Sequence, residues 1–469
     1  MNSASRHPGP HPPARGHALV IGAGIAGLLC ARVLSETFER VTLVERDHLR
    51  RDTRPRPGAP QGRHAHALQA RGLQAFEELF PGLSQELTLA GAPPVDFCRD
   101  TRLQLPHGAP PPRTSGIRVQ PVSRPLLEET VRRRVEDLDG VLTVDTRTVT
   151  GLIVPPTGLR VTGLRVERRS SRHARSNPAE ELHADLVVDA SGRGTHLPDW
   201  LTRLGLPGVP ETVVDARVGY ATRAYRTDPE SAPAWRALFE LPSPPHHPRG
   251  AVALRIEGDR LLVTLQGAGG DHPPTDAQGF ESFLESLSSG LHGALRPLEP
   301  EPSVARYGRT ANRRAHYHRL PRWPEGLVVL GDALCAFNPV YAQGMTIAAL
   351  EAQALGQLLT SWPSESLDGL ARQAQRRMAR LTLWPWFLAT LTDRGWADGR
   401  PPAHIRAGLR YLERWQRSVP HSPRLHRDLA RVTNSLAGPA TVLHPLHLAG
   451  ILGPLPWVRR SRGTAPARE

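Results

Sequence analysis

The chain has 469 residues and a formal net charge of +14 at pH 7, and every one of its 59 basic side chains is an arginine. Because there is no lysine, the protein can form neither a lysine Schiff base nor a lysine-containing P-loop. The three cysteines, Cys30, Cys98 and Cys335, form no close pair, which argues against a metal site of the zinc type and for a reducing, cytoplasmic setting.

The positive charge would permit contact with nucleic acid or with an anionic membrane. The arginines are scattered, however, aromatic residues make up 5% of the chain, and no nucleic-acid-binding motif is present. We therefore predict no nucleic-acid partner. Residues 1–16 are rich in Pro, His and Ser and lack an apolar run, so we predict a disordered tail there rather than a signal peptide, and a second tail at 459–469.

A strand, a glycine-rich turn and a helix open the ordered part of the chain. Residues 17–21 form a short apolar run, a helix is expected over 28–34, and a second strand over 41–44. This order predicts the first strand–helix–strand unit of a nucleotide-binding sheet.

Gly22, Gly24 and Gly27 lie in this turn with G-x-G-x-x-G spacing. The first glycine permits the tight turn, the second lets backbone approach a pyrophosphate, and the third lets helix and strand pack closely. Glu45 ends the second strand, 18 residues beyond Gly27, near where an acid meets an adenosine ribose. The pattern predicts a nucleotide site here.

A second polar block, GDALCAFNPVYAQGMTIAAL, spans residues 331–350 and follows an apolar strand at 327–330. Asp332 can accept hydrogen bonds from sugar or polyol hydroxyls. The N–H groups of Gly344 and Met345 open a helix, where the helix dipole favours negative charge. Two such acids, Glu45 and Asp332, at opposite ends of the chain indicate one long cofactor with the form of FAD.

Four blocks in this order resemble those of FAD-dependent monooxygenases of the para-hydroxybenzoate hydroxylase fold, closest to the branch with squalene and polyketide epoxidases. The resemblance covers roughly residues 16–360. The blocks are the GAGIAG turn, Pro121-Val122-Ser123-Arg124, ADLVVDASGR at 184–193, and the block with GD, NP and QGM at 331–345.

The resemblance implies a discontinuous FAD site. Gly22, Gly24, Gly27 and Glu45 would hold the AMP half, and Arg124 would reach the FAD from the start of a helix. The Gly331–Asp332 pair would bind the ribityl or pyrophosphate region, and Gly344 with Met345 would face the pyrimidine edge of the flavin. Asp189 ends an apolar strand of the same sheet, with its carboxyl end facing the cofactor.

The turn after Asp189 reads Asp-Ala-Ser-Gly, where aromatic hydroxylases of this fold have Asp-Gly. This form is more similar to flavin halogenases and isoprenoid reductases, and it argues against direct NADPH binding. The electron source is therefore left open between NAD(P)H and reduced flavin or an electron-transfer partner, with a separate reductase as a candidate partner.

Halogenation by the familiar mechanism requires a lysine to relay hypohalous acid, and the chain has none. Trp384 and Trp386 lie far from the tryptophan motif of that family, so we predict that they are packing residues. In the loop Gln61-Gly62-Arg63-His64-Ala65-His66, the two histidines lack a third metal ligand. By resemblance this loop lies near the flavin, where His can bond cofactor or substrate; a solvated loop is the alternative.

The predicted fold is α/β: a Rossmann-like FAD-binding lobe of the GR2 type, an antiparallel substrate lobe and a C-terminal helical region. The FAD lobe comprises 17–90, 119–200 and 304–360; the substrate lobe comprises 91–118 and 201–303; the helical region is 361–458. Strands are expected over 215–226 and 250–266, with a turn at 257–259, and a helix over 280–287.

The run 436–458 is strongly apolar, but prolines at 439, 445 and 454 and two histidines argue against a spanning helix. It either packs on the core or makes a peripheral membrane contact, as a hydrophobic substrate would favour.

The implied reaction inserts one oxygen atom from O2 into a hydrophobic natural-product or isoprenoid-like substrate through a flavin C4a-hydroperoxide. No residue stands out as a catalytic base, which favours epoxidation over hydroxylation. Two other functions stay open: an FAD-dependent reductase or dehydrogenase acting on double bonds, and a flavoprotein that serves as a binding or electron-transfer partner.

Overall fold

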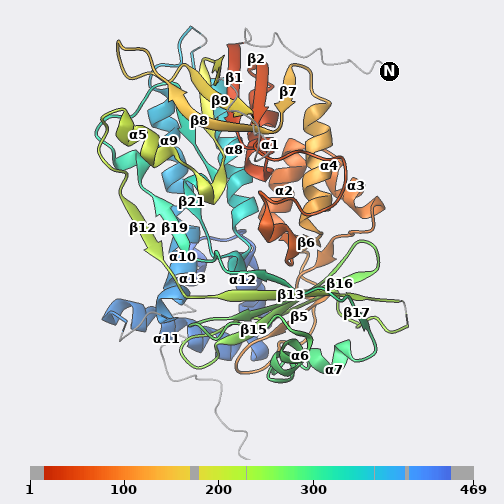
Figure 1. Ribbon diagram of the computed structural model, residues 1–469. Coiled ribbons are helices and arrows are strands. Elements are labelled where there is room, and N and C mark those ends of the chain that lie inside the picture. Colours follow the sequence, from red (N-terminus) through yellow and green to blue (C-terminus); the bar gives the residue numbers. More distant parts are fainter. Residues whose placement is uncertain (1–14, 169–178, 229, 364, 397–400, 445–469) are drawn as a thin grey trace, which may run out of the picture.

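The structure is a computed structural model that describes residues 15–168, 179–228, 230–363, 365–396 and 401–444. Arg15 and Gly16, predicted to belong to a tail, instead begin the first strand. The remainder of that predicted tail, the tail at 459–469 and residues 445–458 of the apolar run lie outside the described residues. Figure 1 shows a helix-flanked parallel sheet at one end of the molecule and a broad antiparallel sheet at the other.

The parallel sheet has five strands and forms the nucleotide-binding type of fold that the sequence predicts. Its spatial order is β20 (Leu327–Val329), β11 (Leu186–Asp189), β1 (Arg15–Ile21), β2 (Phe38–Val44) and β7 (Val141–Val144). The strands β11 and β20 and the second half of β1, residues 18–21, are nearly continuous apolar runs, as expected for parallel strands covered on both faces. The strands predicted at 17–21 and 41–44 are confirmed, each beginning a few residues earlier.

The helices around this sheet bury their apolar side chains against it and against one another. Helix α1 packs on α4 and α8, and α9 packs on α8 and β20. The bounds are α1 (Ile25–Leu34), α2 (Ala70–Leu79), α3 (Leu83–Leu89), α4 (Arg124–Glu136), α5 (Leu197–Arg203), α8 (Gly344–Ser361) and α9 (Leu370–Leu381). An antiparallel meander of β8 (Arg147–Ile153), β9 (Gly163–Arg168) and β10 (Glu180–His183) also contacts the sheet.

The way the strands pair brings three turns together at one edge of the parallel sheet. Ile21 pairs with Asp189, and Asp189 pairs with Val329. The turns that follow β1, β11 and β20 therefore lie side by side, although they are far apart in the sequence. This is the edge at which open α/β sheets bind their ligands.

The second sheet is predominantly antiparallel and gathers strands from two separate parts of the chain. Its order is β17 (Glu299–Pro300), β13 (Gly219–Arg226), β16 (Arg260–Gly267), β15 (Arg249–Ile256), β14 (Ala237–Glu240) and β5 (Thr101–Gln104), with β18 (Ala305–Tyr307) also on β13. The predicted turn at 257–259 connects β15 to β16, with Gly258 and Asp259 at positive φ. The predicted helix at 280–287 is found as α6 (Ala277–Glu285), beside α7 (Leu291–Leu295).

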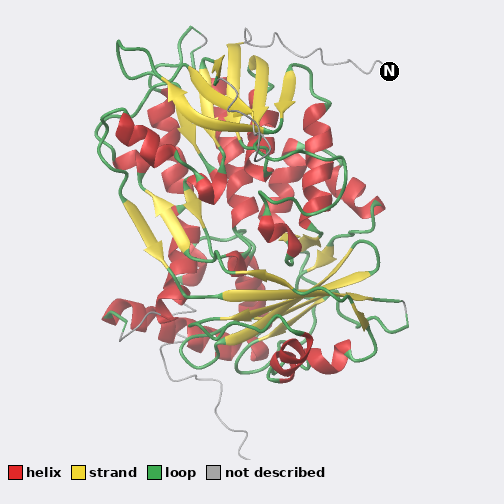
Figure 2. Cartoon of the chain, viewed as in Figure 1, coloured by secondary structure: helices red, strands yellow, loops and turns green. Residues whose placement is uncertain are grey.

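Short strands connect the two regions: β3 (Ala67–Leu68), β4 (Val95–Asp96), β6 (Arg118–Pro121), β12 (Glu211–Val214), β19 (Asn312–Ala315) and β21 (Cys335–Ala336). Figure 2 shows the helices gathered around the parallel sheet and a second group of helices beside the antiparallel one. Beside the antiparallel sheet lie α6 and α7 and the C-terminal helices α10 (Leu383–Asp393), α11 (Ala403–Ser418), α12 (Pro423–Thr433) and α13 (Pro439–Val442). Among the residues described, no helix has the length and apolar character needed to cross a bilayer.

Candidate cofactor and substrate site

The glycine turn after β1 has the geometry that its spacing predicts. Gly22 has a φ of +93°, in the region that favours glycine. A Cβ on Gly27 would lie 1.9 Å from the carbonyl oxygen of Gly22, so this glycine lets the helix and the turn pack together. A Cβ on Gly24 would meet nothing closer than Arg56 Nη2 at 3.5 Å. The second glycine therefore faces open space in which a ligand can approach the backbone.

Glu45 lies beside this turn and is 4% exposed. Its carboxylate accepts hydrogen bonds from the N–H of Ala23 at 2.8 Å and of Asp47 at 2.9 Å. The bond to Ala23 fixes the position of the glycine turn. Arg56 Nη1 lies 3.4 Å from the same carboxylate.

Arg56 links three acids at this end of the site. Besides Glu45, its guanidinium contacts Asp47 at 3.1 Å and donates to Glu128 at 2.5 Å. Burial acts to lower the pKa of Arg56, but Glu128 and Glu45 overcome it, so the pKa is raised and the side chain stays charged. Sequence reasoning missed Arg56, because nothing in the loop RPRPG marks it as different from the other exposed-looking arginines.

Arg124 is the first residue of α4, whose N-cap Ser123 accepts a hydrogen bond from the N–H of Leu126. Its side chain donates to Glu128 at 3.0 Å, one turn further along. Burial disfavours the charged form of Glu128, but Arg124 and Arg56 outweigh it and lower the pKa of this carboxyl. Two arginines and three acids thus form one network of ion pairs within the wall of the site.

The second block reaches the site from β20. Gly331 has a φ of +63° and donates its N–H to Glu351 at 2.7 Å. The carboxylate of Asp332 lies 3.5 Å from Arg193 Nε, and a Cβ on Gly344 would lie 3.7 Å from Asp332 Oδ1. The Gly-Asp pair therefore adjoins the start of α8. Burial raises the pKa of Asp332, and the charge of Arg193 opposes this rise.

Asp189 is fully buried, and its carboxylate stays within its own turn. It accepts hydrogen bonds from the N–H and hydroxyl of Ser191 and from the hydroxyl of Thr195. Its neighbour Arg193 donates to the carbonyl of Ala311 at 2.8 Å and also bonds the carbonyl of Phe337. Asp189 thus shapes the turn that carries Arg193 to Asp332.

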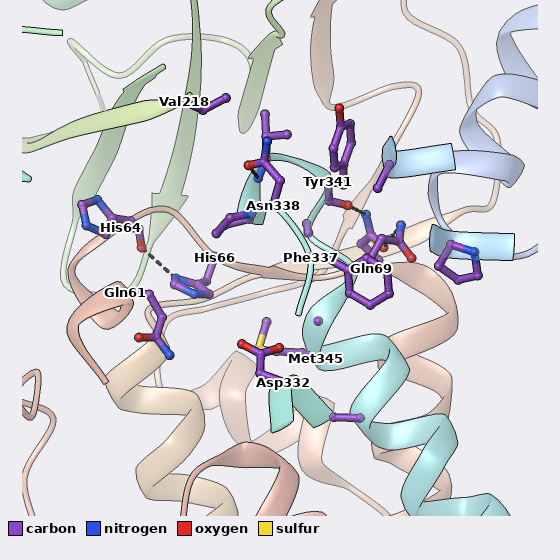
Figure 3. A pocket seen from close by; sticks show the side chains of 18 of the residues that line it. Gln61, His64, His66, Gln69, Val218, Asp332, Phe337, Asn338, Tyr341 and Met345 are labelled. Atoms are coloured by element: carbon purple, nitrogen blue, oxygen red, sulfur yellow. Dashed lines mark hydrogen bonds between the residues drawn. The ribbon is translucent and has the colours of Figure 1, made fainter. Parts of the chain in front are cut away.

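In the loop 61–66, His64 is buried and His66 is partly buried, so neither ring is freely solvated. Burial lowers the pKa of His64 to about 4 and that of His66 to about 3, so both rings are neutral at pH 7. His64 Nδ1 bonds the hydroxyl of Thr222 at 2.6 Å, and its Nε2 has no hydrogen-bond partner among the described residues. Figure 3 shows the bond from His66 Nδ1 to the carbonyl oxygen of His64. Among the described residues, no cluster of three metal-ligating side chains is present.

A single cavity of about 880 Å³ joins these segments. Eight of the ten predicted cofactor residues line it: Gly22, Gly24, Glu45, Arg124, Gly331, Asp332, Gly344 and Met345. Gly27 and Asp189 lie behind the wall, where they shape the turns.

The same cavity continues between the second sheet and the C-terminal helices. We call this part the substrate chamber; its lining residues come from β5, β14, β15 and α10 to α13 and include Leu103, Phe239, Trp384, Phe387, Tyr411 and Trp415. Both tryptophans pack as predicted: Trp386 is buried, and Trp384 packs against a hydrophobic cluster and stacks on Phe387, while it also lines the chamber. Within the described residues, Asp393 is the one charged side chain that these elements contribute to the lining.

The remaining charged lining residues are at the cofactor end: Glu45, Arg46, Arg56, Arg124, Arg147, Arg193 and Asp332. The cavity thus has a polar, charged half and an apolar half. Burial of apolar surface favours binding in the second half, and an ionic substrate would lose hydration there without a matching charge.

Comparison with known proteins identifies a relative in sequence. The chain is 35% identical over 381 residues to Protein Rv3254 of Mycobacterium tuberculosis (strain ATCC 25618 / H37Rv), which covers 80% of each chain. No family model matches it.

Two solved structures show the likeness in three dimensions. The flavin-dependent brominase Bmp2 has a TM-score of 0.63 at 16% identity, covering 89% of this chain and 93% of that one. The p-nitrophenol 4-monooxygenase PnpA from Pseudomonas putida DLL-E4 has a TM-score of 0.60 at 16% identity, covering 91% and 99%. The chain therefore has the fold of flavin-dependent monooxygenases, as predicted.

Proposed function

The chain belongs to the family of the Mycobacterium tuberculosis protein Rv3254, and from this premise we propose that it is an FAD-dependent monooxygenase. It inserts one oxygen atom from O2 into a neutral, hydrophobic natural-product or isoprenoid-like substrate, by epoxidation or hydroxylation. One observation carries the proposal: a single cavity joins the glycine turn of a nucleotide site to an apolar chamber.

The residues present fit FAD at both ends. Gly24 leaves room for a pyrophosphate, and Glu45 lies where an adenosine ribose would reach it. The guanidinium groups of Arg56 and Arg124, which line the same end of the cavity, would attract the phosphates. At the other end, the start of α8 at Gly344 would face the pyrimidine edge of a flavin.

Bound FAD supplies the reaction with O2, which no protein side chain can perform alone. The chain's own residues bind and orient. Asp332 would accept hydrogen bonds from the polyol chain, and the N-terminal dipole of α8 would stabilise negative charge on the reduced ring. The aromatic side chains of the chamber would exclude water and hold the substrate beside the flavin.

The finer assignment to the squalene and polyketide epoxidase branch is part of this proposal. It rests on the four sequence blocks, and none of the three proteins compared above is described as an epoxidase. Although the fold is similar to that of the brominase Bmp2, we do not propose halogenation, because the familiar mechanism requires a lysine and the chain has none.

The electrons are proposed to come from a separate reductase or another reduced carrier. The support is the Asp-Ala-Ser-Gly turn and the lack of a second G-x-G-x-x-G turn in the sequence. The setting is proposed to be the cytoplasm, and the apolar run that starts at 436 would make any contact with a membrane surface.

The purified protein is expected to be yellow, to release FAD on acid precipitation, and to incorporate labelled oxygen from O2 into one component of a metabolite extract. Under anaerobic conditions, NADPH alone should bleach the flavin slowly, and an added flavin reductase should restore fast reduction. A colourless protein that binds no added FAD would overturn the proposal. Product formed equally well without O2 would indicate a reductase, and reoxidation rates that no extract component changes would indicate an electron-transfer partner.

Asp332→Ala is expected to raise the FAD dissociation constant roughly ten-fold to a hundred-fold, more than any other single substitution of an acid. A hydrogen bond to a charged group contributes roughly 1.5–3 kcal/mol. The carboxylate of Asp332 bonds no backbone N–H in the structure and contacts Arg193, so the apoprotein should lose little stability. Titration of FAD and the melting curve of the apoprotein measure the two effects.

Asp368→Ala provides the control for this prediction, because Asp368 is an exposed acid paired with Arg160 at a distance from the cavity. It should change neither quantity. A lower apo melting temperature with unchanged FAD affinity would assign Asp332 to the scaffold instead.

A further inference from the structure

Asp393 is a buried carboxylate that forms no ion pair with any described arginine or histidine. It ends α10, is 2% exposed and lines the substrate chamber. Its Oδ1 accepts the hydroxyl proton of Tyr341 at 2.5 Å, and its Oδ2 accepts from the side-chain amides of Asn312 at 2.5 Å and Asn338 at 3.0 Å. Among the described residues no arginine or histidine forms an ion pair with it.

Three other buried acids of the described residues, Asp96, Asp189 and Glu351, also lack an ion pair with a cation, but their roles are different. Each accepts a hydrogen bond from at least one backbone N–H group, and none of them lines the cavity. A buried anion without a counter-charge is expensive, and such groups cluster where chemistry takes place. Of these four described acids, Asp393 alone lines the cavity, where a substrate can approach.

Tyr341 connects this acid to the chamber. It ends the 3-10 turn Pro339–Tyr341, three residues before Gly344 opens α8. Its side chain is partly exposed and lines the cavity. Figure 3 shows its hydroxyl at the end of the ring that lies farther from Asp332. A hydroxyl oxygen that donates to Asp393 still has a lone pair with which to accept a proton from a ligand.

Resting on the proposed function, we propose that the substrate is a neutral phenol and that Tyr341 is the catalytic residue that accepts its hydroxyl proton, with Asp393 as the positioning residue behind it. The O–H bond of the substrate breaks and an O–H bond forms on Tyr341, while the proton of Tyr341 moves to Asp393 Oδ1. The electron pair stays on the substrate oxygen, and the phenolate so formed raises the electron density of the ring carbon that receives the oxygen atom.

The charge environment suits a reversible proton acceptor. Burial raises the pKa of Asp393 to about 6, against the hydrogen bonds from Tyr341, Asn338 and Asn312, and Asp215 raises it further. The carboxyl is therefore ionised at pH 7. Tyr220, the other titratable side chain of this network, donates to Asn338 Oδ1 at 3.1 Å. The sequence offered no base and so favoured epoxidation; the pair Tyr341–Asp393 favours hydroxylation.

The test uses FAD-loaded full-length protein, reduced with dithionite and mixed with O2 in a single turnover, so that no electron partner is needed. The probes are 2-naphthol, the more acidic 6-cyano-2-naphthol, and 2-methoxynaphthalene, which lacks the hydroxyl. Wild-type protein is expected to hydroxylate both naphthols and not the methyl ether. Tyr341→Phe and Asp393→Asn should lower the rate with 2-naphthol by about 10²–10⁴-fold.

Two readouts separate proton transfer from a structural role. The loss should be smaller for the cyano-naphthol, and it should shrink as pH rises towards the ionisation of the free naphthol. The rate in the wild type should fall as pH drops through about 6, and Asp393→Asn should lose this dependence. Tyr225→Phe is the matched control, because that hydroxyl also bonds a carboxylate, Glu281, but lies outside the cavity.

Each alternative outcome counts against the assignment. No binding of either naphthol, oxygenation of the methyl ether at the rate of 2-naphthol, or an equal loss for both naphthols at every pH would overturn it. Oxygen incorporated into the methyl ether or into an alkene would leave the monooxygenase proposal in place, whereas failure to bind FAD would overturn the proposed function itself.

Discussion

Gly24→Val is expected to abolish FAD binding while the apoprotein remains folded. A Cβ at this position meets only the end of the Arg56 side chain at 3.5 Å, so the fold itself can accommodate substitution. A branched side chain would nevertheless occupy the space in which a pyrophosphate approaches the backbone. We expect no saturable binding in a fluorescence titration with FAD, together with a far-ultraviolet circular dichroism spectrum like that of the parent apoprotein.

Gly27→Ala is the informative comparison for this prediction. Its Cβ would lie 1.9 Å from the carbonyl oxygen of Gly22, so the turn or the helix must move, and the apoprotein itself should be destabilised. Within one motif, Gly24 thus leaves room for the ligand, whereas Gly27 allows the helix to pack against the turn. If the Gly24→Val protein bound FAD as the parent does, the adenosine end of the cofactor would have to lie elsewhere.

Arg56→Ala is expected to lower the free energy of unfolding by about 3–5 kcal/mol, because removing one partner of a buried ion pair leaves the other uncompensated. Here three carboxylates lose the same guanidinium: Glu45, Asp47 and Glu128. Their side chains are 4–7% exposed, so water cannot replace the lost charge. Urea denaturation of the apoprotein measures the change, and Arg54→Ala, at an exposed arginine of the same loop, should leave it within about 0.5 kcal/mol.

The loss in the Arg56→Ala protein should depend on pH. The pKa of Glu128 is lowered in the folded parent, so its contribution is present above the ordinary carboxyl pKa of about 4.3 and is lost as pH falls through the folded value. The difference between variant and parent should therefore stay the same from pH 7 down to about 4.3 and shrink only as the pH falls further. A difference that stays constant below about pH 4.3 as well would show that Arg56 acts through packing rather than charge.

Local patterns were sufficient for much of the nucleotide half of the molecule. The glycine spacing, the apolar runs on either side of it and the Gly-Asp pair before a helix each determine a turn or an element within about 20 residues. The strands at 17–21 and 41–44 and the hairpin turn at 257–259 were predictable for the same reason, since alternation, glycine and strand length act locally. These features also indicated where a long cofactor would enter and leave the site.

The sequence by itself thus determined the fold class and the placement of eight predicted residues around one cavity. Only the tertiary structure decided which charges meet. Arg56 and Glu128 are 72 positions apart, and Tyr341 and Asp393 are 52 apart. No periodicity or motif connects such pairs, because their contact depends on how α4 and α10 pack against loops from elsewhere in the chain. Tertiary packing also forms the substrate chamber and brings Trp384 into its wall. The same packing lowers the pKa values of the histidines in the loop 61–66, which no local pattern in the sequence indicates.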